Sequence, residues 1–173
     1  MKVKLLCTAF LVCLIVLSGC ETSKVQKAQN SIEITLPEDI PSFVKEEDFS
    51  KIEWDRVATE FDTGERNDMV GNKSKIGIIG SELKPKEVHK WLWHFWGIDK
   101  GELTVVGYNK NTSMISPVLS NETWSRNGIG GEVNGADGSM PSNVVLPEAG
   151  EWALLVYIDG EFFDTLVIEV KDK

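Results

Sequence analysis

The chain has 173 residues and a formal net charge of −9 at pH 7. This acidic balance argues against a nucleic-acid partner and against electrostatic adhesion to anionic lipid, because both would repel the chain. The three cysteines are Cys7, Cys13 and Cys20. Beyond residue 20 the sequence therefore excludes disulfides, cysteine-ligated zinc and thiol nucleophiles.

The N-terminal segment predicts export. Residues 1–4 are basic and residues 5–17 are almost wholly apolar, but this run is shorter than the roughly 20 residues that cross a bilayer. Residues 17–20 read L-S-G-C and resemble the lipobox of bacterial lipoprotein signal peptides. The resemblance implies that residues 1–19 are removed and that Cys20 is lipidated. The alternative is an ordinary secretory peptide that contains a cysteine.

The predicted organisation after cleavage is a tether followed by one domain. Residues 20–30 comprise the lipidated cysteine and a polar, flexible linker. Residues 31–173 are predicted to form a single β-sandwich domain. Cleavage removes two lysines and no acids, so the net charge of −9 becomes −11. We expect the membrane to be a partner through Cys20, with the domain on the extracytoplasmic face of the cell membrane. The sequence leaves open whether that is a Gram-positive surface or a periplasmic leaflet.

The first half of the domain gives mixed signals. Apolar and polar side chains alternate over residues 31–36, which predicts a half-buried strand. Residues 45–49 suit one helical turn, and residues 52–57 fit either a strand or a helix. A polar loop is predicted at residues 62–68, and a short strand at 73–80 that ends at a glycine.

The densest apolar stretch of the domain is V-H-K-W-L-W-H-F-W-G at residues 88–97. Apolar residues fall on both faces of a strand with period two, so we expect a central strand that is buried largely on both sides. Trp93, His94 and Trp96 are candidate aromatic or ligand-binding residues. Core packing is the simpler explanation, and an exposed platform for sugar rings or an apolar ligand is the alternative. His89 and His94 fall on opposite faces, so no shared metal site is predicted.

Residues 101–108 predict a further strand and residues 114–119 an edge strand, because a proline interrupts the latter. Residues 120–140 are rich in Gly, Asn and Ser and are predicted to be a long loop. Long loops on rigid scaffolds often bind partners. The candidate binding residues there are Trp124, Arg126, Asn134 and Asp137. Their spacing matches no calcium loop, and the sequence predicts no cofactor.

The C-terminal third predicts a strand at residues 142–146 and then a hairpin. Residues 152–158 and 161–170 are apolar-rich and flank Asp159-Gly160, which is a strong turn signal between strands. The sequence L-P-x-x-G-x-W at 146–152 resembles the corner before the last hairpin of immunoglobulin-like domains, although Trp152 stands where a tyrosine is usual. The expected fold is an all-β, immunoglobulin-like β-sandwich of about eight strands.

A wider resemblance covers residues 73–170. The segments K-I-G-I-I-G, K-W-L-W-H-F-W-G and N-G-A-D-G-S-M-P-S-N, with the closing hairpin, resemble uncharacterised lipoproteins of Gram-positive, Bacillus-like bacteria. The W-H-F-W-G core is the most specific part. The resemblance supports the fold and the location, and it implies no particular activity.

Two hypotheses of different class follow. The first is a non-enzymatic module that binds a protein or an envelope component through the loop at residues 120–140. The second is a carrier of a small ligand or metal that uses His94, Met140 and the tryptophans. A hydrolase is disfavoured, because the sequence reveals no paired nucleophile and base.

Overall fold

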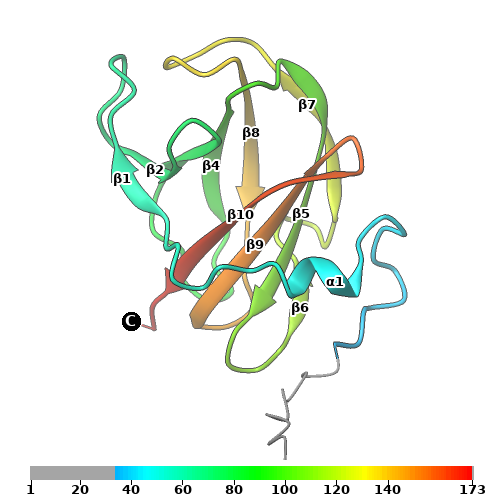
Figure 1. Cartoon of the computed structure of the whole chain (residues 1–173). Coiled ribbons are helices and arrows are strands. Elements are labelled where there is room, and N and C mark those ends of the chain that lie inside the picture. Colours follow the sequence, from blue (N-terminus) through cyan, green and yellow to red (C-terminus); the bar gives the residue numbers. More distant parts are fainter. Residues whose placement is uncertain (1–33, 173) are drawn as a thin grey trace, which may run out of the picture. The chain divides into compact units, whose positions relative to one another are not determined.

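The computed structural model describes residues 34–172. Within this range a short helix precedes ten strands (Figure 1). The elements are α1 (Glu46–Phe49), β1 (Thr59–Phe61), β2 (Met69–Asn72), β3 (Ile76–Gly80), β4 (His89–Phe95), β5 (Lys100–Asn109), β6 (Ile115–Pro117), β7 (Ser125–Gly130), β8 (Gly138–Val144), β9 (Gly150–Ile158) and β10 (Glu161–Val170). The prediction of an all-β fold is confirmed, with ten strands in place of about eight.

All the strand pairs are antiparallel, and they form one curled sheet in the order β1-β2-β3-β4-β8-β7-β5-β9-β10, with β6 paired to β5. β7 and β8 share a single residue pair, Gly130 with Ser139. The sheet therefore consists of two half-sheets joined by a narrow connection. The neighbours β5-β9-β10 in one half-sheet correspond to the C-F-G order of an immunoglobulin-like sandwich.

The main core lies between the two half-sheets. β4 contributes Trp93 and Phe95, and the facing half-sheet contributes residues such as Leu154 and Val156 from β9. All four side chains are fully buried. Burying a large apolar side chain stabilises a fold by about 1.5–3 kcal/mol, so this aromatic-rich layer is the main source of stability.

A second apolar cluster covers the other face of β9. The chain before β1, including α1, crosses this face (Figure 1). Val44 and Phe49 of this segment pack in one cluster with Leu155 and Tyr157 of β9. β9 is therefore buried on both faces, which explains why apolar residues occur at consecutive positions.

Polar contacts fix the same N-terminal segment to the sheet. The buried Asp48 carboxylate accepts hydrogen bonds from the Tyr157 hydroxyl at 3.0 Å and from the Lys51 ammonium at 2.8 Å. Burial alone would raise the pKa of Asp48, but these hydrogen bonds, together with one from the Lys45 backbone, lower it. Asp48 is therefore held as a carboxylate beneath α1, where it satisfies a buried hydroxyl.

The hairpin turn is confirmed. Asp159 and Gly160 both have positive φ, at 49° and 83°, as a two-residue type I′ turn requires. The Asp159 carboxylate also accepts a hydrogen bond from the Glu102 backbone N–H at 2.8 Å. The turn is thus tied to β5 as well as to its own two strands.

Three other local predictions are wrong. Residues 34–36 are not a strand, and residues 31–33 of that prediction lie outside the described range. Residues 52–57 contain a turn at 54–55 and a single β-bridge at Val57 instead of a strand or helix. The predicted loop at 120–140 contains β7 and the start of β8. β7 (S-R-N-G-I-G) buries only Ile129 among its six residues, so its sequence lacks the apolar alternation that reveals a strand.

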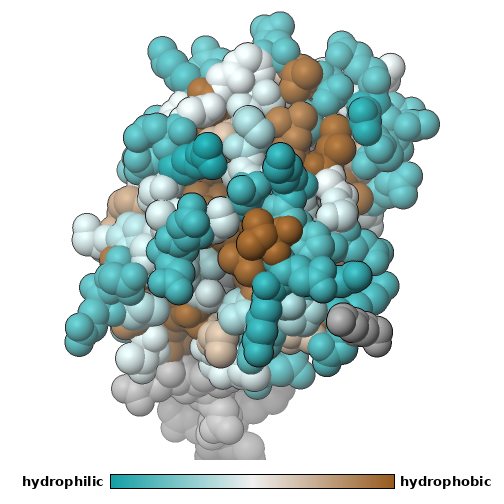
Figure 2. All heavy atoms as spheres, turned by 180° about the vertical axis from the view of Figure 1, so that it is seen from behind, coloured by the Kyte–Doolittle hydropathy of each residue, from teal (hydrophilic) through white to brown (hydrophobic). Residues whose placement is uncertain are grey.

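The opposite side of the molecule is shown in Figure 2. Hydrophobic side chains reach the surface there as small areas among hydrophilic ones. Scattered apolar residues are normal for a soluble domain, whereas one broad apolar patch would mark a large interface.

Candidate functional site

Four of the residues singled out by sequence come together at the end of β4. The His94 Nε2 atom lies 2.9 Å from the Asn134 side-chain nitrogen, and the Trp96 indole donates to the Gly135 carbonyl at 2.7 Å. Asp137 accepts a hydrogen bond from the Gly97 N–H at 2.6 Å. These contacts hold the segment after β7 against the Trp-rich strand.

His94 is fully buried, and its Nδ1 atom has no hydrogen-bond partner in the described part of the chain. Burial lowers the pKa of His94 below its ordinary value, because a charged imidazolium is poorly solvated there. If Asn134 donates to Nε2, the ring proton lies on Nδ1. His94 is thus a neutral ring that holds Asn134 in place.

The other candidate residues do not join this group. Trp93 is a core residue, and its indole donates to the Ser142 hydroxyl at 2.8 Å. Trp124, predicted to be a loop contact, is 8% exposed and donates to the Asp39 carboxylate at 3.0 Å. Arg126 is exposed on β7. The candidate residues of the predicted binding loop therefore do not form one site, because the indole of Trp124 anchors the N-terminal segment, and their role in binding stays a prediction.

The donor set suggested for a metal is also wrong. Met140 is paired with Trp93 across β8 and β4, whereas His94 is paired with Ser139. Side chains of directly opposed residues share a face of the sheet, so Met140 points into the main core and His94 to the other face. Among residues 34–172 no group of three or more His, Cys, Asp or Glu is placed to hold a metal ion.

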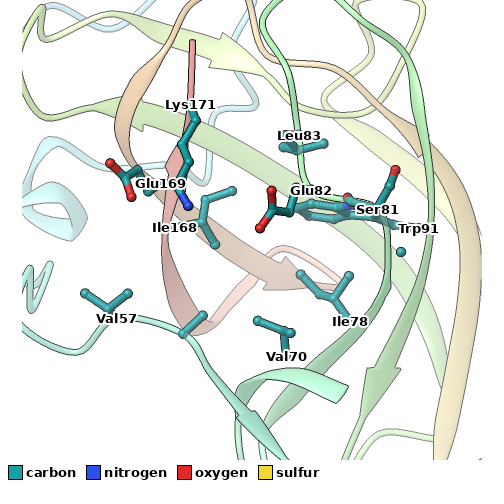
Figure 3. Close-up of a pocket in the computed structure, with 12 residues that line it drawn as sticks. Val57, Val70, Ile78, Ser81, Glu82, Leu83, Trp91, Ile168, Glu169 and Lys171 are labelled. Carbon is teal, nitrogen blue, oxygen red and sulfur yellow. The ribbon is translucent and has the colours of Figure 1, made fainter. Parts of the chain in front are cut away.

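A groove that the sequence did not indicate lies where the two ends of the curled sheet approach one another. We call it the seam groove (Figure 3). Its volume is about 290 Å³. Its apolar walls come from five separate segments of the chain. These are Val57 with Ala58, Val70 of β2, Ile78 of β3 with Leu83 shortly after it, Trp91 of β4, and Ile168 of β10. Val57 and Val70 are 48% and 41% exposed, so apolar surface is open to solvent here.

Polar side chains border the seam groove. Figure 3 shows the carboxylates of Glu82 and Glu169 and the ammonium of Lys171 around the apolar walls. Gly80 lies against Trp91, because a Cβ at Gly80 would come within 2.2 Å of the Trp91 ring. The glycine thus lets the indole lie flat along β3, where its N–H donates to the Ser81 carbonyl at 3.1 Å.

One side of the seam is closed by a polar cluster, the seam latch, made of Arg56, Asn72, Asp164 and Thr165. The Asn72 amide donates to the Asp164 carboxylate at 2.9 Å and to the Thr165 carbonyl at 2.8 Å. Arg56 lies 2.5 Å from the same carboxylate. Because Asn72 ends β2 and Asp164 belongs to β10, these bonds tie one edge of the sheet to the other.

Beyond the latch, the β10 edge has a backbone position without a strand partner in the described residues. Alternate residues of a strand turn their N–H and C=O groups to the same side. The Thr165 carbonyl accepts the latch side chains, and the Val167 carbonyl accepts the Ala58 N–H at 2.8 Å. The backbone groups of Glu169 therefore turn to the same side, toward the seam groove.

The β3 edge offers a matching position. The Lys75 carbonyl accepts the Trp96 N–H, so this carbonyl faces β4, and by alternation the backbone groups of Ile76, Ile78 and Gly80 face the opposite side. β2 pairs with Ile76 and Ile78 but ends its ladder before Gly80. Gly80 and Glu169 thus present free backbone groups to the same groove.

Ser81, which lines the groove, contacts a histidine that the sequence did not connect with it. The Ser81 hydroxyl lies 2.8 Å from His89 Nδ1, and His89 Nε2 accepts the Lys84 N–H at 3.2 Å. Since Nε2 accepts, Nδ1 carries the proton and donates it to Ser81. A catalytic base must instead accept the serine proton. The pair is therefore oriented against nucleophilic catalysis.

Sequence comparison assigns a family to this architecture. Residues 43–168 match a domain of unknown function, DUF4871. The chain belongs to the DUF4871 family. The match runs from the segment that crosses β9 to β10, so all the apolar wall residues of the seam groove lie within the family domain. No curated protein matches the chain.

A solved structure shares this fold. The X-ray crystal structure of a "putative lipoprotein from Bacillus anthracis" superposes with a TM-score of 0.62 and 20% sequence identity, over 76% of this chain and 96% of that chain. The similarity agrees with the resemblance to uncharacterised lipoproteins of Bacillus-like bacteria. At this identity it shows the fold of the DUF4871 domain. Among residues 34–172 no helix is both long and apolar enough to cross a membrane.

Proposed function

We propose that the chain is a lipid-anchored module that binds a partner protein on the extracytoplasmic face of the cell membrane, without catalysis. The L-S-G-C sequence at residues 17–20 supports removal of residues 1–19 and lipidation of Cys20. The lipoprotein description of the structural neighbour supports the same location. Residues 20–30 would then be a tether that presents the β domain at residues 31–173 to its surroundings.

The binding site that we assign is the seam groove, and its occupant is an extended, apolar segment of the partner protein. One observation carries this assignment, namely that Gly80 and Glu169 both line an apolar groove at positions where β3 and β10 have no strand partner on the groove side among the described strand pairs. An added strand satisfies the backbone groups at such positions, and its alternate side chains enter the apolar space. Two carboxylates and one ammonium border the groove, so basic residues flanking the segment would complement it.

The test uses the full-length lipidated protein in detergent and a seven-residue peptide of alternating Val and Thr with lysines at both ends. Isothermal titration should show saturable binding. A peptide with the same side chains but N-methylated at alternate backbone positions should bind at least tenfold more weakly, because it cannot donate to a strand edge. Val70→Glu should weaken binding by a similar factor, because it places a charge on the apolar wall.

The matched control is Val133→Glu, since Val133 is similarly exposed, at 38%, and does not line the groove. It should leave peptide affinity unchanged. Equal binding of the two peptides would refute strand addition. Binding of a fatty acid that depends on Val70, without any binding of the peptide, would replace this proposal with a small-ligand carrier. Absence of binding by either probe would overturn the assignment of the groove.

A further inference from the structure

A second concave site lies next to Trp96, and we call it the Trp96 cleft. It has a volume of about 320 Å³ and is lined by Phe61 to Gly64, Lys73, Ser74 and Trp96. These residues come from the end of β1 and its following loop, the turn between β2 and β3, and the end of β4. The volume equals that of about ten water molecules, which is the scale of one hexose ring with its hydroxyl groups. None of these residues lines the seam groove.

The aromatic wall of this cleft is held in a fixed position. The Trp96 indole donates to the Gly135 carbonyl at 2.7 Å, and its backbone N–H donates to the Lys75 carbonyl at 3.1 Å. Phe61 packs against it with ring centroids 5.8 Å apart and an angle of 59° between the planes. Both rings are only partly buried. A ring fixed in this way offers its open face without losing side-chain entropy when a ligand binds.

Charged groups stand at the edge of the aromatic wall. One oxygen of Asp62 accepts the Gly64 N–H at 2.6 Å, so the other remains as an acceptor. Lys73 is exposed and takes part in none of the ion pairs among residues 34–172. The cleft thus combines an apolar ring face with one free acceptor and one free donor. Hydrogen bonds to such charged groups are about twice as strong as neutral ones.

We propose that the Trp96 cleft binds a sugar ring, as part of an oligosaccharide. A pyranose has a flat face of C–H groups and an edge of hydroxyls, so it needs an aromatic surface and polar partners at the same place. Trp96 supplies the surface, Asp62 accepts from a hydroxyl, and Lys73 donates to one. Pockets of this kind combine aromatic walls with a few polar groups that fix orientation.

Two aromatic rings beside a carboxylate also suit a quaternary ammonium ion. Lys73 argues against that ligand, because a second positive charge in the same cleft would repel it. The sugar ring matches all three kinds of group that line the cleft, whereas the ammonium ion matches two. This site shares no residue with the seam groove, so a negative result for one site does not affect the proposal for the other.

The test is saturation-transfer NMR and titration of the full-length protein in detergent with short N-acetylglucosamine oligomers, maltose oligomers and tetramethylammonium. One saccharide series should bind saturably, with transfer strongest at the ring C–H protons. Trp96→Ala should weaken binding at least tenfold, and Trp96→Phe by less, because a smaller aromatic face remains. Lys73→Gln and Asp62→Asn should each weaken it several-fold. Val70→Glu, in the seam groove, should leave sugar affinity unchanged.

Circular dichroism and thermal unfolding show whether each variant is folded. If Trp96→Ala does not fold, the two surface variants Lys73→Gln and Asp62→Asn still test the sugar site. Saturable binding of tetramethylammonium without any sugar would overturn the proposal in favour of a cation site. Sugar affinity that is unchanged in Trp96→Phe, Lys73→Gln and Asp62→Asn would place the sugar elsewhere and refute it. Binding of no saccharide would also refute it.

Discussion

At the end of β4 a single imidazole shows how burial sets the chemistry of a residue. His94 is fully buried, its Nε2 atom contacts Asn134, and its Nδ1 atom has no partner in the described residues. Burial lowers its pKa, the backbone of Gly77 and Leu92 opposes part of this change, and the positive charge of Arg66 adds a smaller lowering. Two histidines in the chain leave few sources of pH sensitivity near neutrality.

The direction of the pH effect follows from linkage. Below the ordinary histidine value of 6.5 the unfolded chain gains a proton at His94, while the folded chain does not until a lower pH. Unfolding is therefore favoured as pH falls below 6.5. We expect the free energy of unfolding in urea to decrease from pH 7.5 to pH 5, and we expect His94→Phe to reduce this decrease.

The matched control for that measurement is Phe95→Leu, which disturbs the next, fully buried position of β4 without changing a titratable group. It should preserve the pH dependence of the wild-type protein. If the free energy of unfolding falls equally from pH 7.5 to pH 5 in the wild-type protein and in His94→Phe, protonation of His94 does not limit stability between these pH values.

At the scale of elements, the β9–β10 hairpin is the part of the fold that local sequence specifies most firmly. Gly160 has φ of 83°, and a Cβ there would lie 3.2 Å from the Phe43 ring. Gly160→Ala should therefore lower the free energy of unfolding by about 1–2 kcal/mol, through the cost of left-handed backbone and the close contact. Chemical denaturation measures this loss.

Asp159→Asn is the comparison, because asparagine also accepts positive φ. Its backbone remains compatible with the turn, so it should be less destabilising than Gly160→Ala. A larger loss for Asp159→Asn would mean that the carboxylate bond to the Glu102 N–H stabilises the hairpin more than the turn geometry does.

Strands with strong apolar periodicity were predictable, and those without it were not. β4, β5, β9 and β10 have dense apolar patterns and appear where the sequence placed them. β1 and β2 have three and four residues, and β7 buries one residue of six. They are strands because neighbouring edges pair with them, which is tertiary information that a local window does not contain.

The sites divide in a similar way. His94, Trp96, Asn134 and Asp137 were chosen from sequence, and the structure brings them together through hydrogen bonds across about 40 residues. The seam groove was missed because its walls come from five segments without a shared motif. Exposed Val57 and Val70 in otherwise polar surroundings were the available signal, but single apolar residues at a surface are too common to identify a groove.

At the scale of the whole domain, the seam latch connects the two ends of the curled sheet. Asp164 is 7% exposed and receives bonds from Asn72 and Arg56. Asn72→Ala removes two hydrogen bonds and leaves a buried carboxylate with fewer partners, so it should lower the free energy of unfolding by about 1–3 kcal/mol. Hydrogen exchange should accelerate first in β1 and β2, because the latch holds their hairpin against β10.

Asn143→Ala is a suitable control for the latch, since Asn143 is exposed on β8, away from the seam. It should change stability by less than about 0.5 kcal/mol. The opposing outcome is that hydrogen exchange in Asn72→Ala accelerates equally across the domain, with no earlier change in β1 and β2. That result would show that the two sheet ends do not separate as a local unit.

The N-terminal segment that crosses β9 has a mechanical consequence. It is held by Phe49 and its neighbours, by the Asp48–Tyr157 hydrogen bond, and at its far end by the parallel bridge of Val57 with Val167. A pulling force applied at the N-terminal end of the described chain would load this segment before any strand of the sheet. Peeling it away would uncover Tyr157 and the indole of Trp124, while the sandwich beneath kept its own core. The domain would thus unfold under tension in two stages, and the N-terminal segment that crosses β9 would detach first.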